Sequence, residues 1–271
     1  MRILVTGATG YIGAHTCEAL YNRGHSVIGT DYNINQNDIS NVVEDFFVWD
    51  IREPGGRQRY NLGARLKMDK IVHIAAMTKV PQSVKNPYDY YMTNVIGTKN
   101  VIDAAPCDHF VYCSTGSAFE PQSNPYAGSK HAGELVAKQF KPKSSIVRFY
   151  NVSGNYGMSK YDDEYSHLIR RAAAVVNGKF DKLYIHGTDY DTRDGTCVRN
   201  YTHVKDIVDS LLRITENEPT KEIDCLGSLD GHSVREVIDA MANVSRVNFE
   251  VVEGPRRPGD IVISTVPTES R

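Results

Sequence analysis

The first half of the chain alternates between short apolar runs and longer segments in which apolar residues recur every three or four positions. The apolar runs predict strands at residues 2–6, 26–31, 45–49, 70–74, 110–114 and 145–149. The longer segments predict helices at residues 11–23, 88–105 and 126–140. Several of the strands are apolar throughout, as expected for parallel strands that helices cover on both faces. The pattern therefore predicts the α/β fold class, with a doubly wound parallel sheet and right-handed crossovers.

The pattern changes after Asn151, where the predicted elements become shorter and more polar. It predicts a loop at residues 154–163, helices at 164–176 and 204–215, and strands at 183–186 and 248–252. Ser233 and Glu236 have the spacing of a capping box, which predicts a helix that ends near residue 245. We interpret residues 1–152 as a larger domain, to which about residues 198–226 return. Residues 153–271 then form a smaller α/β lobe over the carboxyl ends of the parallel strands, where ligands bind in such sheets.

A glycine-rich loop connects the first predicted strand to the first predicted helix. Gly7 and Gly10 would allow the backbone to turn tightly beside a pyrophosphate, and Gly13 would let the helix pack closely against the sheet. The N–H groups and the dipole at the start of this helix favour an anion there. Asp31 ends the second strand, 18 positions after Gly13, where an acid binds the adenosine ribose and repels a 2′-phosphate. The loop therefore predicts a Rossmann-type domain that binds NAD rather than NADP.

Tyr126 and Lys130 stand four positions apart in a predicted helix, so both side chains lie on the same face. A nearby ammonium and a cationic nicotinamide would lower the pKa of the phenol from its usual value of about 10. Tyr126 could then accept a proton from a sugar hydroxyl at neutral pH. A Tyr-x-x-x-Lys pair alone is common by chance, and a tyrosine packed on a lysine stem is then the simpler interpretation. The glycine loop upstream and the apolar strand just before the pair favour catalysis.

More specific motifs follow in the second half of the chain. They are Gly187-Thr188-Asp189-Tyr190, the runs at residues 192–196 and 198–204 with Asp206, and Arg257-Pro258-Gly259-Asp260. Together with the glycine loop, they extend almost from end to end. On these motifs the chain resembles the extended short-chain dehydrogenase/reductase family, also described as the NAD-dependent epimerase/dehydratase family. Within that family, the run from Gly187 to Asp206 is typical of the UDP-glucose 4-epimerases.

The resemblance implies a set of NAD contacts. Asp50 and Ile51 would flank the adenine, Ala75 and Ala76 would line the cofactor cleft, and Asn94 would lie close by. The other residues that the resemblance and the glycine loop assign to NAD are Gly7, Gly10, Tyr11, Ile12, Gly13, Asp31, Thr78, Tyr126, Lys130 and Phe149.

The resemblance also implies a substrate and a reaction, the C4 epimerisation of a UDP-hexose. Thr115 stands where the family places its catalytic Ser or Thr, which hydrogen-bonds Tyr126 and the 4-oxygen of the sugar. Tyr126 would remove the 4-hydroxyl proton while a hydride passes from C4 to NAD, and the 4-keto sugar would turn over and take the hydride back. Lys130 would hold the nicotinamide ribose. The residues implied to contact the UDP-sugar are Thr115, Tyr126, Asn151, His167, Leu168, Arg199, Tyr201, Arg257, Asp260 and Ser264.

The chain departs from the family's pattern at four places. Only eleven positions separate Thr115 from Tyr126, so the loop between them is short. Thr78 stands where the epimerases often carry a lysine, which predicts a weaker field at the nicotinamide. His167-Leu168 replaces a usual Asn-Leu pair, and the sequence stops soon after Pro267, which predicts a truncated smaller lobe.

A further position bears on the choice of sugar. Epimerases restricted to unacetylated sugars tend to have a bulky tyrosine where this chain has Ser264. A small side chain there would leave room for an acetamido group. We therefore expect the protein to accept UDP-N-acetylglucosamine besides UDP-glucose and UDP-galactose.

Other readings of the same motifs remain open. A nucleotide-sugar dehydratase shares the fold but needs an acid and a base directly after Thr115, where this chain has Gly116-Ser117. A reductase or decarboxylase on a related sugar shares the C4 oxidation, and Asp31 disfavours a reductase that uses NADPH. From a different class, a non-catalytic NAD-binding module would not need Thr115, Tyr126 and Lys130 together.

Composition disfavours other classes of protein. The chain has 31 Lys plus Arg against 33 Asp plus Glu, so no basic surface for nucleic acid is expected. Its five cysteines show no Cys-x-x-Cys pair and no histidine at metal-binding spacing, so we expect reduced thiols and no metal. Met1 leads directly into the first strand, and no apolar stretch is long enough to span a membrane. We expect a cytoplasmic homodimer, which the resemblance places on helices 88–105 and 126–140.

Overall fold

The structure is a computed structural model that describes residues 1–33, 37–54, 67–141, 143–157, 165, 167–219, 223–228 and 230–266. Three sequence-based expectations lie partly or wholly outside the described residues. They are most of the predicted loop at 154–163, the start of the predicted helix at 164, and the truncation after Pro267.

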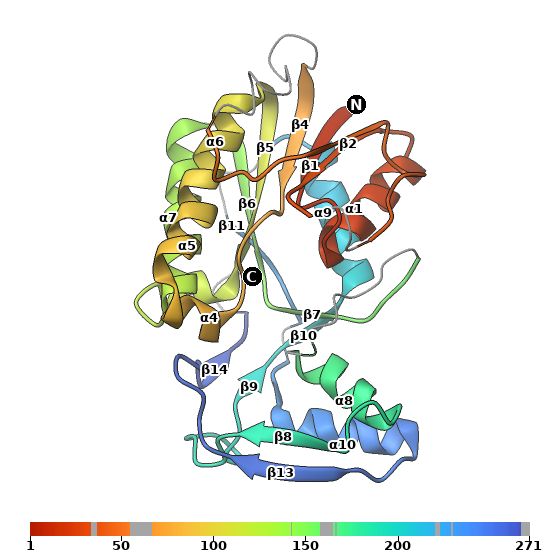
Figure 1. The fold of residues 1–271 in the computed structure, drawn as a ribbon, viewed down its shortest axis with the longest axis vertical. Helices are drawn as coiled ribbons and strands as arrows, with labels where there is room; N and C mark the ends of the chain where they lie inside the picture. Colours follow the sequence, from red (N-terminus) through yellow and green to blue (C-terminus); the bar gives the residue numbers. More distant parts are fainter. Residues whose placement is uncertain are drawn as a thin grey trace.

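A seven-stranded parallel sheet forms the larger half of the molecule, in the order β11-β6-β5-β4-β1-β2-β3 (Figure 1). Its strands are β1 (Arg2–Thr6), β2 (Ser26–Asp31), β3 (Asp45–Val48), β4 (Met68–His73), β5 (Cys107–Thr115), β6 (Ser144–Phe149) and β11 (Ile223–Leu226). The predicted fold class, a Rossmann-type doubly wound sheet, is confirmed. The six predicted strands are all present, with ends shifted by up to three residues.

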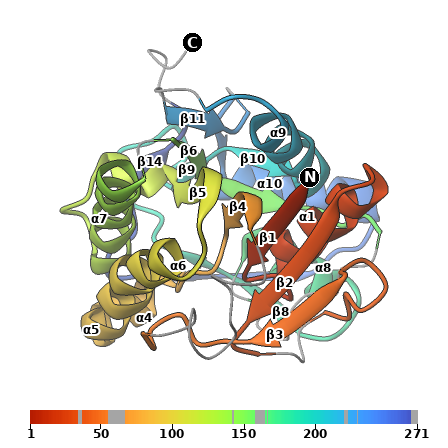
Figure 2. The ribbon, with the colours of Figure 1, turned by 90° about the horizontal axis from the view of Figure 1, so that it is seen from above.

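Helices cover both faces of this sheet (Figure 2). The helices α1 (Tyr11–Asn22) and α9 (Val204–Glu216) pack on one face. The other face carries α6 (Thr98–Ala104) and α7 (Pro125–Phe140). The prediction of a single helix at 88–105 is wrong in detail. The segment forms three consecutive elements, which are α5 (Pro87–Tyr91), the π-helical turn η1 (Met92–Gly97) and α6. The short helix α4 (Val80–Lys85) precedes it and was not predicted.

The two faces of the sheet bury alternate residues of each strand, since successive side chains of a strand point to opposite faces. Ile3 packs under α1 and α9, whereas its neighbour Leu4 packs under α6 and α7, and neither is exposed to solvent. Burying such a side chain contributes roughly 1.5–3 kcal/mol. Trp49, the single tryptophan of the chain, belongs to the second cluster and is 3% exposed. The two apolar clusters explain why the strands are apolar on both faces.

The smaller lobe has its own core. The strand β8 (Lys182–His186) pairs in parallel with β13 (Glu250–Gly254), and α8 (Leu168–Val176) and α10 (Val234–Ser245) pack beside them. The predicted capping box of α10 is confirmed, because the Ser233 hydroxyl accepts from the Glu236 N–H and the Glu236 carboxylate accepts from the Ser233 N–H. The strand predicted at 248–252 begins two residues later. The buried residues of this core are Ala172, Val175, Leu183, Ile185 and Ile238.

Short strands connect the two halves of the molecule (Figure 1). The pair β7 (Asn151–Ser153) and β10 (Tyr201–His203) runs in parallel between them. Next to it, β9 (Val198–Arg199) lies between β12 (His232–Ser233) and β14 (Ile263–Ser264). Of the segment 198–226, α9 and β11 thus pack with the large sheet, whereas β9 does not. No helix in the described ranges is long and apolar enough to cross a membrane.

Candidate active site

The glycine loop after β1 is tightly packed, as the sequence predicted. Gly7 has a φ of +69°, which favours glycine, and a Cβ atom there would lie 2.8 Å from the backbone N of Ala75. A Cβ atom on Gly13 would lie 1.9 Å from the carbonyl oxygen of Gly7. These contacts bring the start of α1 against the loop, and they leave no room for a side chain at Gly7 or Gly13.

Asp31 lies at the carboxyl end of β2 and is 7% exposed. Its carboxylate accepts hydrogen bonds from the backbone N–H of Thr9 at 3.2 Å, the hydroxyl of Thr9 at 2.9 Å and the N–H of Tyr32 at 2.8 Å. Burial raises the pKa of Asp31, and the hydrogen bonds from Thr9 lower it. The carboxylate is therefore held next to the glycine loop, at the place predicted for the adenosine ribose.

The other residues predicted to contact the adenosine follow β3. The Asp50 carboxylate accepts from the Arg52 guanidinium at 3.0 Å, and this hydrogen bond lowers the pKa of Asp50. The side chain of Ile51 is buried against Gly97, where an added Cβ would lie 2.8 Å from Ile51 Cδ1. Ile51 therefore contributes to the core beneath α6 as well as to the edge of the predicted cofactor cleft.

Asn94 fixes the backbone that follows β4. Its Oδ1 accepts from the N–H of Met77 at 2.9 Å, and its Nδ2 donates to the carbonyl of Met77 at 3.0 Å and to the Ser129 hydroxyl at 3.0 Å. The side chain is 1% exposed. Asn94 thus ties the segment after Ala75 and Ala76 to α7. Thr78, one residue beyond Met77, is exposed.

Thr115, Tyr126 and Lys130 come together where β5 ends and α7 begins. Thr115 is the last residue of β5, and its hydroxyl accepts from the N–H of Ser117 at 3.3 Å. Asn124 caps α7 by accepting from the N–H of Ala127 at 2.9 Å, which places Tyr126 in the first turn of the helix. Tyr126 is half-buried, and the Thr115 side chain is near enough to lower the pKa of its phenol. The structure therefore places Thr115 and Tyr126 beside each other.

Lys130 lies one turn further along α7 and is 3% exposed. Its Nζ donates a 2.7 Å hydrogen bond to the carbonyl of Cys113 and lies 4.3 Å from the centre of the Tyr112 ring. Burial lowers the pKa of Lys130 to about 8, which the nearby carboxylate of Glu134 partly opposes. The ammonium is thus anchored to the backbone of β5 rather than to the Tyr126 hydroxyl.

The pKa of Tyr126 differs from the sequence-based expectation. Burial raises it to about 12, and the hydrogen bond with Thr115 only partly opposes this effect. The expected lowering by Lys130 is wrong for the described groups, because desolvation of the phenol outweighs the other contributions. The protein side chains alone therefore keep Tyr126 protonated at neutral pH.

A buried charged pair lies directly behind this trio and was not predicted. Arg148 donates from Nε and Nη2 to the two carboxylate oxygens of Glu134 at 2.8 and 2.7 Å, and the Ser114 hydroxyl donates to Glu134 at 2.6 Å. The guanidinium also stacks 4.1 Å from the Phe119 ring. The available sequence signal was that Glu134 follows Lys130 by four positions, which places both on one face of α7. The pair links β5, β6 and α7 immediately below Thr115.

The residues predicted to bind UDP are distributed over the short strands between the two halves. Arg199 on β9 donates to the carbonyls of Val198 at 2.9 Å and Val262 at 3.2 Å. Asn151 on β7 donates to the carbonyl of Asn200 at 3.2 Å, and burial raises the pKa of Tyr201 on β10 to about 12. The structure therefore brings Asn151, Arg199 and Tyr201 to one region, below the carboxyl end of the sheet (Figure 1).

The remaining predicted residues lie at the borders of this region. Arg257 donates to the Asp260 carboxylate at 3.0 Å. Leu168 packs against the core of the smaller lobe, and His167 immediately precedes α8. Phe149 ends β6 and is 8% exposed in the core under α1 and α9. Leu168 and Phe149 therefore stabilise the two cores as well as standing at predicted binding positions.

The family motif around Asp189 makes a contact with Arg256 that was not predicted from the sequence. The Arg256 guanidinium donates to the Asp189 carboxylate at 2.7 Å and stacks 4.2 Å from the ring of Tyr190. This contact ties the turn after β8 to the segment that leads to Arg257. The contact between Arg256 and Asp189 helps to position Arg257, the next residue. Motif spacing does not show this contact, because its two partners are far apart in the sequence.

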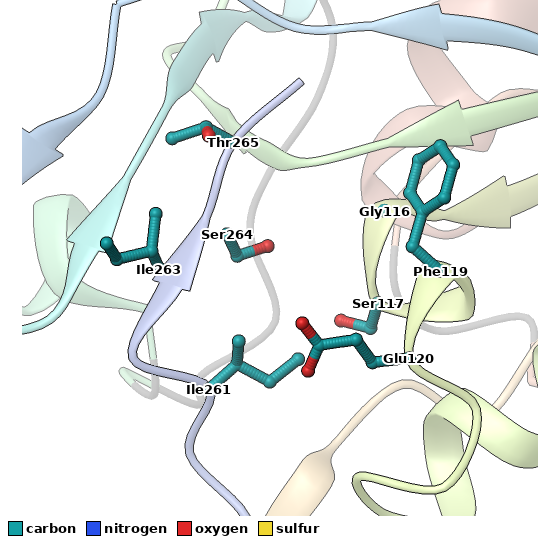
Figure 3. A pocket seen from close by; sticks show the side chains of 8 residues that line it. All are labelled: Gly116, Ser117, Phe119, Glu120, Ile261, Ile263, Ser264 and Thr265. Atoms are coloured by element: carbon teal, nitrogen blue, oxygen red, sulfur yellow. The ribbon is translucent and has the colours of Figure 1, made fainter. Parts of the chain in front are cut away.

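A cavity of about 140 Å³ opens between the two halves, next to Thr115 (Figure 3). One wall is the turn after β5, and the other is the segment around β14, from which Ser264 faces the turn. The lining residues are Gly116, Ser117, Phe119, Glu120, Ile261, Ile263, Ser264 and Thr265. Within the described ranges, no cluster of three or more His, Cys, Asp or Glu side chains could hold a metal ion. The lining combines apolar side chains with hydroxyl groups and one carboxylate, and it begins at Gly116, the residue after Thr115.

Comparisons with known proteins agree with this architecture. A family model described as the NAD dependent epimerase/dehydratase family matches residues 3–225. The UDP-glucose 4-epimerase of Rhizobium meliloti is 35% identical over 289 residues, covering 95% of this chain and 86% of that protein. The solved UDP-Glc/GlcNAc 4-epimerase of Campylobacter jejuni is 34% identical, with a TM-score of 0.76, and the match covers 97% of this chain and 89% of that chain.

A second solved structure extends the comparison. The UDP-glucose-4-epimerase of Stenotrophomonas maltophila, which contains bound NAD and formylated UDP-arabinopyranose, is 27% identical with a TM-score of 0.85. The match covers 99% of this chain and 90% of that chain. The family model and these relatives cover both the sheet and most of the smaller lobe. The chain therefore belongs to the NAD dependent epimerase/dehydratase family.

Proposed function

We propose that this protein is an NAD-dependent C4 epimerase that interconverts UDP-glucose and UDP-galactose through a transient 4-keto sugar. The observation that carries the proposal is the placement of Thr115 at the end of β5 beside Tyr126 in the first turn of α7, with Lys130 one turn further along the same helix. Curated relatives that match 95–96% of this chain are UDP-glucose 4-epimerases, which supports the same reaction.

The residues around the glycine loop fit NAD. The backbone at Gly7 and Gly13 is packed so closely that only glycine is accommodated, and the buried Asp31 carboxylate lies beside the loop. A pyrophosphate at the start of α1 would be bound by backbone N–H groups and the helix dipole. When bound, NAD supplies a hydride acceptor and a positive charge near Tyr126, and a positive charge lowers the pKa of a phenol.

The chain's own residues would then transfer one proton between the 4-oxygen of the sugar and Tyr126. Tyr126 takes the proton from the 4-hydroxyl as the hydride leaves C4, and it returns the proton to the 4-oxygen when the hydride comes back on the other face. Thr115 lies beside Tyr126, where its hydroxyl would orient the phenol by a hydrogen bond. Lys130 is held by the carbonyl of Cys113, where its ammonium would bind the nicotinamide ribose. The proton and the hydride are both returned, so the net reaction is an isomerisation.

The cavity supports a wider choice of sugar. Ser264 presents a small side chain toward the turn at Gly116 and Ser117 (Figure 3). We propose that this position leaves room for an acetamido group, so that UDP-N-acetylglucosamine is also a substrate. The Campylobacter jejuni relative is described as a UDP-Glc/GlcNAc 4-epimerase, which supports this substrate.

We also propose that the protein is a cytoplasmic homodimer. The neighbouring elements α5, η1 and α7 expose large apolar side chains to solvent, which is typical of a protein–protein contact. These side chains are Tyr88 (72% exposed), Tyr91 (44%), Ile96 (44%), Leu135 (55%) and Phe140 (49%). Sedimentation velocity tests the proposal, because a monomer at micromolar concentration would contradict it.

Proton NMR of the purified protein with UDP-galactose tests the proposed reaction. We expect the UDP-glucose anomeric signal to appear when NAD is added. If the purified protein retains NAD, the signal will also appear without added cofactor. The variant Tyr126→Phe is the matched negative control, since it removes a single oxygen atom. If neither UDP-galactose nor UDP-N-acetylglucosamine is converted when NAD is added, the proposed function is wrong.

A further inference from the structure

The cavity next to Thr115 contains one ionisable side chain among its eight described lining residues. The others are serines, a threonine, a glycine, two isoleucines and a phenylalanine, whereas Glu120 carries a carboxylate. Figure 3 shows this carboxylate directed from the turn after β5 toward the segment that carries Ile261 and Ser264. The cavity is therefore neutral and partly apolar except for one negative charge.

The backbone around Glu120 is fixed by the turn that precedes α7. The Glu120 N–H donates to the carbonyl of Ser117 at 3.0 Å, and the Glu120 carbonyl accepts from the N–H of Ser123 at 2.9 Å. These two hydrogen bonds hold the residue at the rim of the cavity. Glu120 stands five positions after Thr115 and six before Tyr126, in the turn that joins β5 to α7, and its side chain is exposed.

The Glu120 carboxylate is exposed and has no ion-pair partner among the residues that the structure describes. The arginines of the neighbouring strands and segments are engaged elsewhere, Arg148 with Glu134, Arg199 with the carbonyls of Val198 and Val262, and Arg257 with Asp260. A ligand in the cavity would thus face an uncompensated negative charge.

Such a charge discriminates between sugar nucleotides by repulsion. A hexose presents hydroxyl groups, which can donate hydrogen bonds to a carboxylate. A uronic acid presents a second carboxylate, which two serines and one glutamate cannot neutralise. Two like charges brought within a few ångströms of each other repel, and solvent and salt partly screen this repulsion because Glu120 is exposed.

We propose that Glu120 is a specificity-determining residue that excludes UDP-uronic acids and restricts the site to UDP-sugars without a carboxylate. The inference rests on the proposed function, because it assumes that the sugar occupies the cavity next to Thr115. The inference names UDP-uronic acids as a class of substrate that the site rejects, and Glu120 as the side chain responsible. The discrimination resides in the turn after β5, on the opposite wall from Ser264.

Three variants test the proposal by competition. UDP-glucuronate is used as an inhibitor of UDP-galactose epimerisation, so that its inhibition constant is measured whether or not it is converted. Glu120→Gln removes the charge with little change of shape, and Glu120→Asp keeps the charge. Glu218→Gln removes one charge from an exposed position just beyond α9, next to the amino-terminal half of β4. The compared quantity is the inhibition constant of UDP-glucuronate divided by the KM for UDP-galactose.

We expect Glu120→Gln to lower this ratio by about fivefold at low salt, and less at high salt, where charges are screened. Glu120→Asp and Glu218→Gln should stay within about twofold of the original protein, since the cavity keeps its charge. An unchanged ratio in Glu120→Gln, or an equal fall in Glu218→Gln, would overturn the inference.

Failure of the proposed function gives a different result. In that case the original protein converts no neutral UDP-sugar, and calorimetric titration of the NAD-loaded protein with UDP-glucose and UDP-glucuronate replaces the kinetic ratio. A preference for UDP-glucose that Glu120→Gln reduces still supports the role of Glu120. Equal affinities for the two ligands contradict it.

Discussion

The two halves of the molecule differ in how they hold their functional side chains. Near Thr115 and Tyr126, the ion pair between Glu134 and Arg148 is buried, with side chains only 3% and 4% exposed. In the smaller lobe, β9 and β14 are two residues long, and the ion pair between Arg193 and Glu236 is about half exposed. Water and salt weaken exposed contacts far more than buried ones. The proton-transfer groups therefore stand on a rigid base, whereas Ser264, which would admit the acetamido group, stands on a strand of two residues.

The largest expected effect is on the rigid side of this comparison. Tyr126→Phe removes the proposed proton acceptor, so we expect kcat to fall by about 10²–10⁴-fold. Proton NMR of UDP-galactose turnover measures the loss. Tyr21→Phe is the matched control, because Tyr21 lies on α1 with half of its side chain exposed. Comparable turnover in Tyr126→Phe and Tyr21→Phe would remove Tyr126 from the mechanism.

The second prediction breaks the buried pair behind the site. Arg148→Met leaves the Glu134 carboxylate without its guanidinium partner, which costs about 3–5 kcal/mol of the free energy of unfolding. Urea denaturation followed by circular dichroism measures it. The double variant Glu134→Gln/Arg148→Met should recover part of the loss, since no uncompensated charge remains buried. A loss below about 1 kcal/mol in Arg148→Met would show that the pair is not shielded from water as described.

The third prediction concerns the wall that carries β14. Ser264→Tyr fills part of the cavity, so we expect its kcat/KM for UDP-N-acetylglucosamine to fall by about tenfold or more relative to UDP-galactose. Ser264→Ala is the control, because it removes the hydroxyl but keeps the space. Retained selectivity for the N-acetyl sugar in Ser264→Tyr would show that another residue limits its size.

The smallest expected effect is at the exposed pair of the smaller lobe. Arg193→Ala removes the contact with Glu236 and should cost less than about 1 kcal/mol of the free energy of unfolding. Repeating the urea denaturation in 1 M salt should reduce the difference further, because exposed charges are screened. If Arg193→Ala lowers the free energy of unfolding as much as Arg148→Met does, the exposed and the buried ion pair contribute equally to stability, and the comparison between the two halves fails.

The sequence predicts the larger half more closely than the smaller one for a physical reason. Strands buried on both faces, such as β1 and β2, have continuous apolar runs, and their bounds were predicted to the residue. Strands of two or three residues, such as β7 and β14, are too short to show any period. The π-helical turn η1 also escaped prediction, because it keeps the apolar residues of the segment at nearly helical spacing.

The candidate site shows the same limit. Motif spacing identified Thr115 and Tyr126, which the structure brings into contact. The lowering of the Tyr126 pKa expected from Lys130 is not found, because burial of the phenol raises this pKa and burial follows from packing that spacing does not reveal. The pair between Glu134 and Arg148 was missed because its partners stand on different elements, fourteen positions apart.

The placement of Trp49 has a consequence for spectroscopy. It is the single tryptophan of the chain, its indole is buried, and its backbone N–H donates to the carbonyl of Asp31 at 2.9 Å. Intrinsic fluorescence excited at the red edge of the protein absorption therefore reports on the larger half alone, next to the predicted position of the adenosine. Emission from Trp49 and circular dichroism from all helices would separate into two transitions if the smaller lobe melts first. Trp49 fluorescence thus follows the unfolding of the larger half separately from that of the smaller lobe.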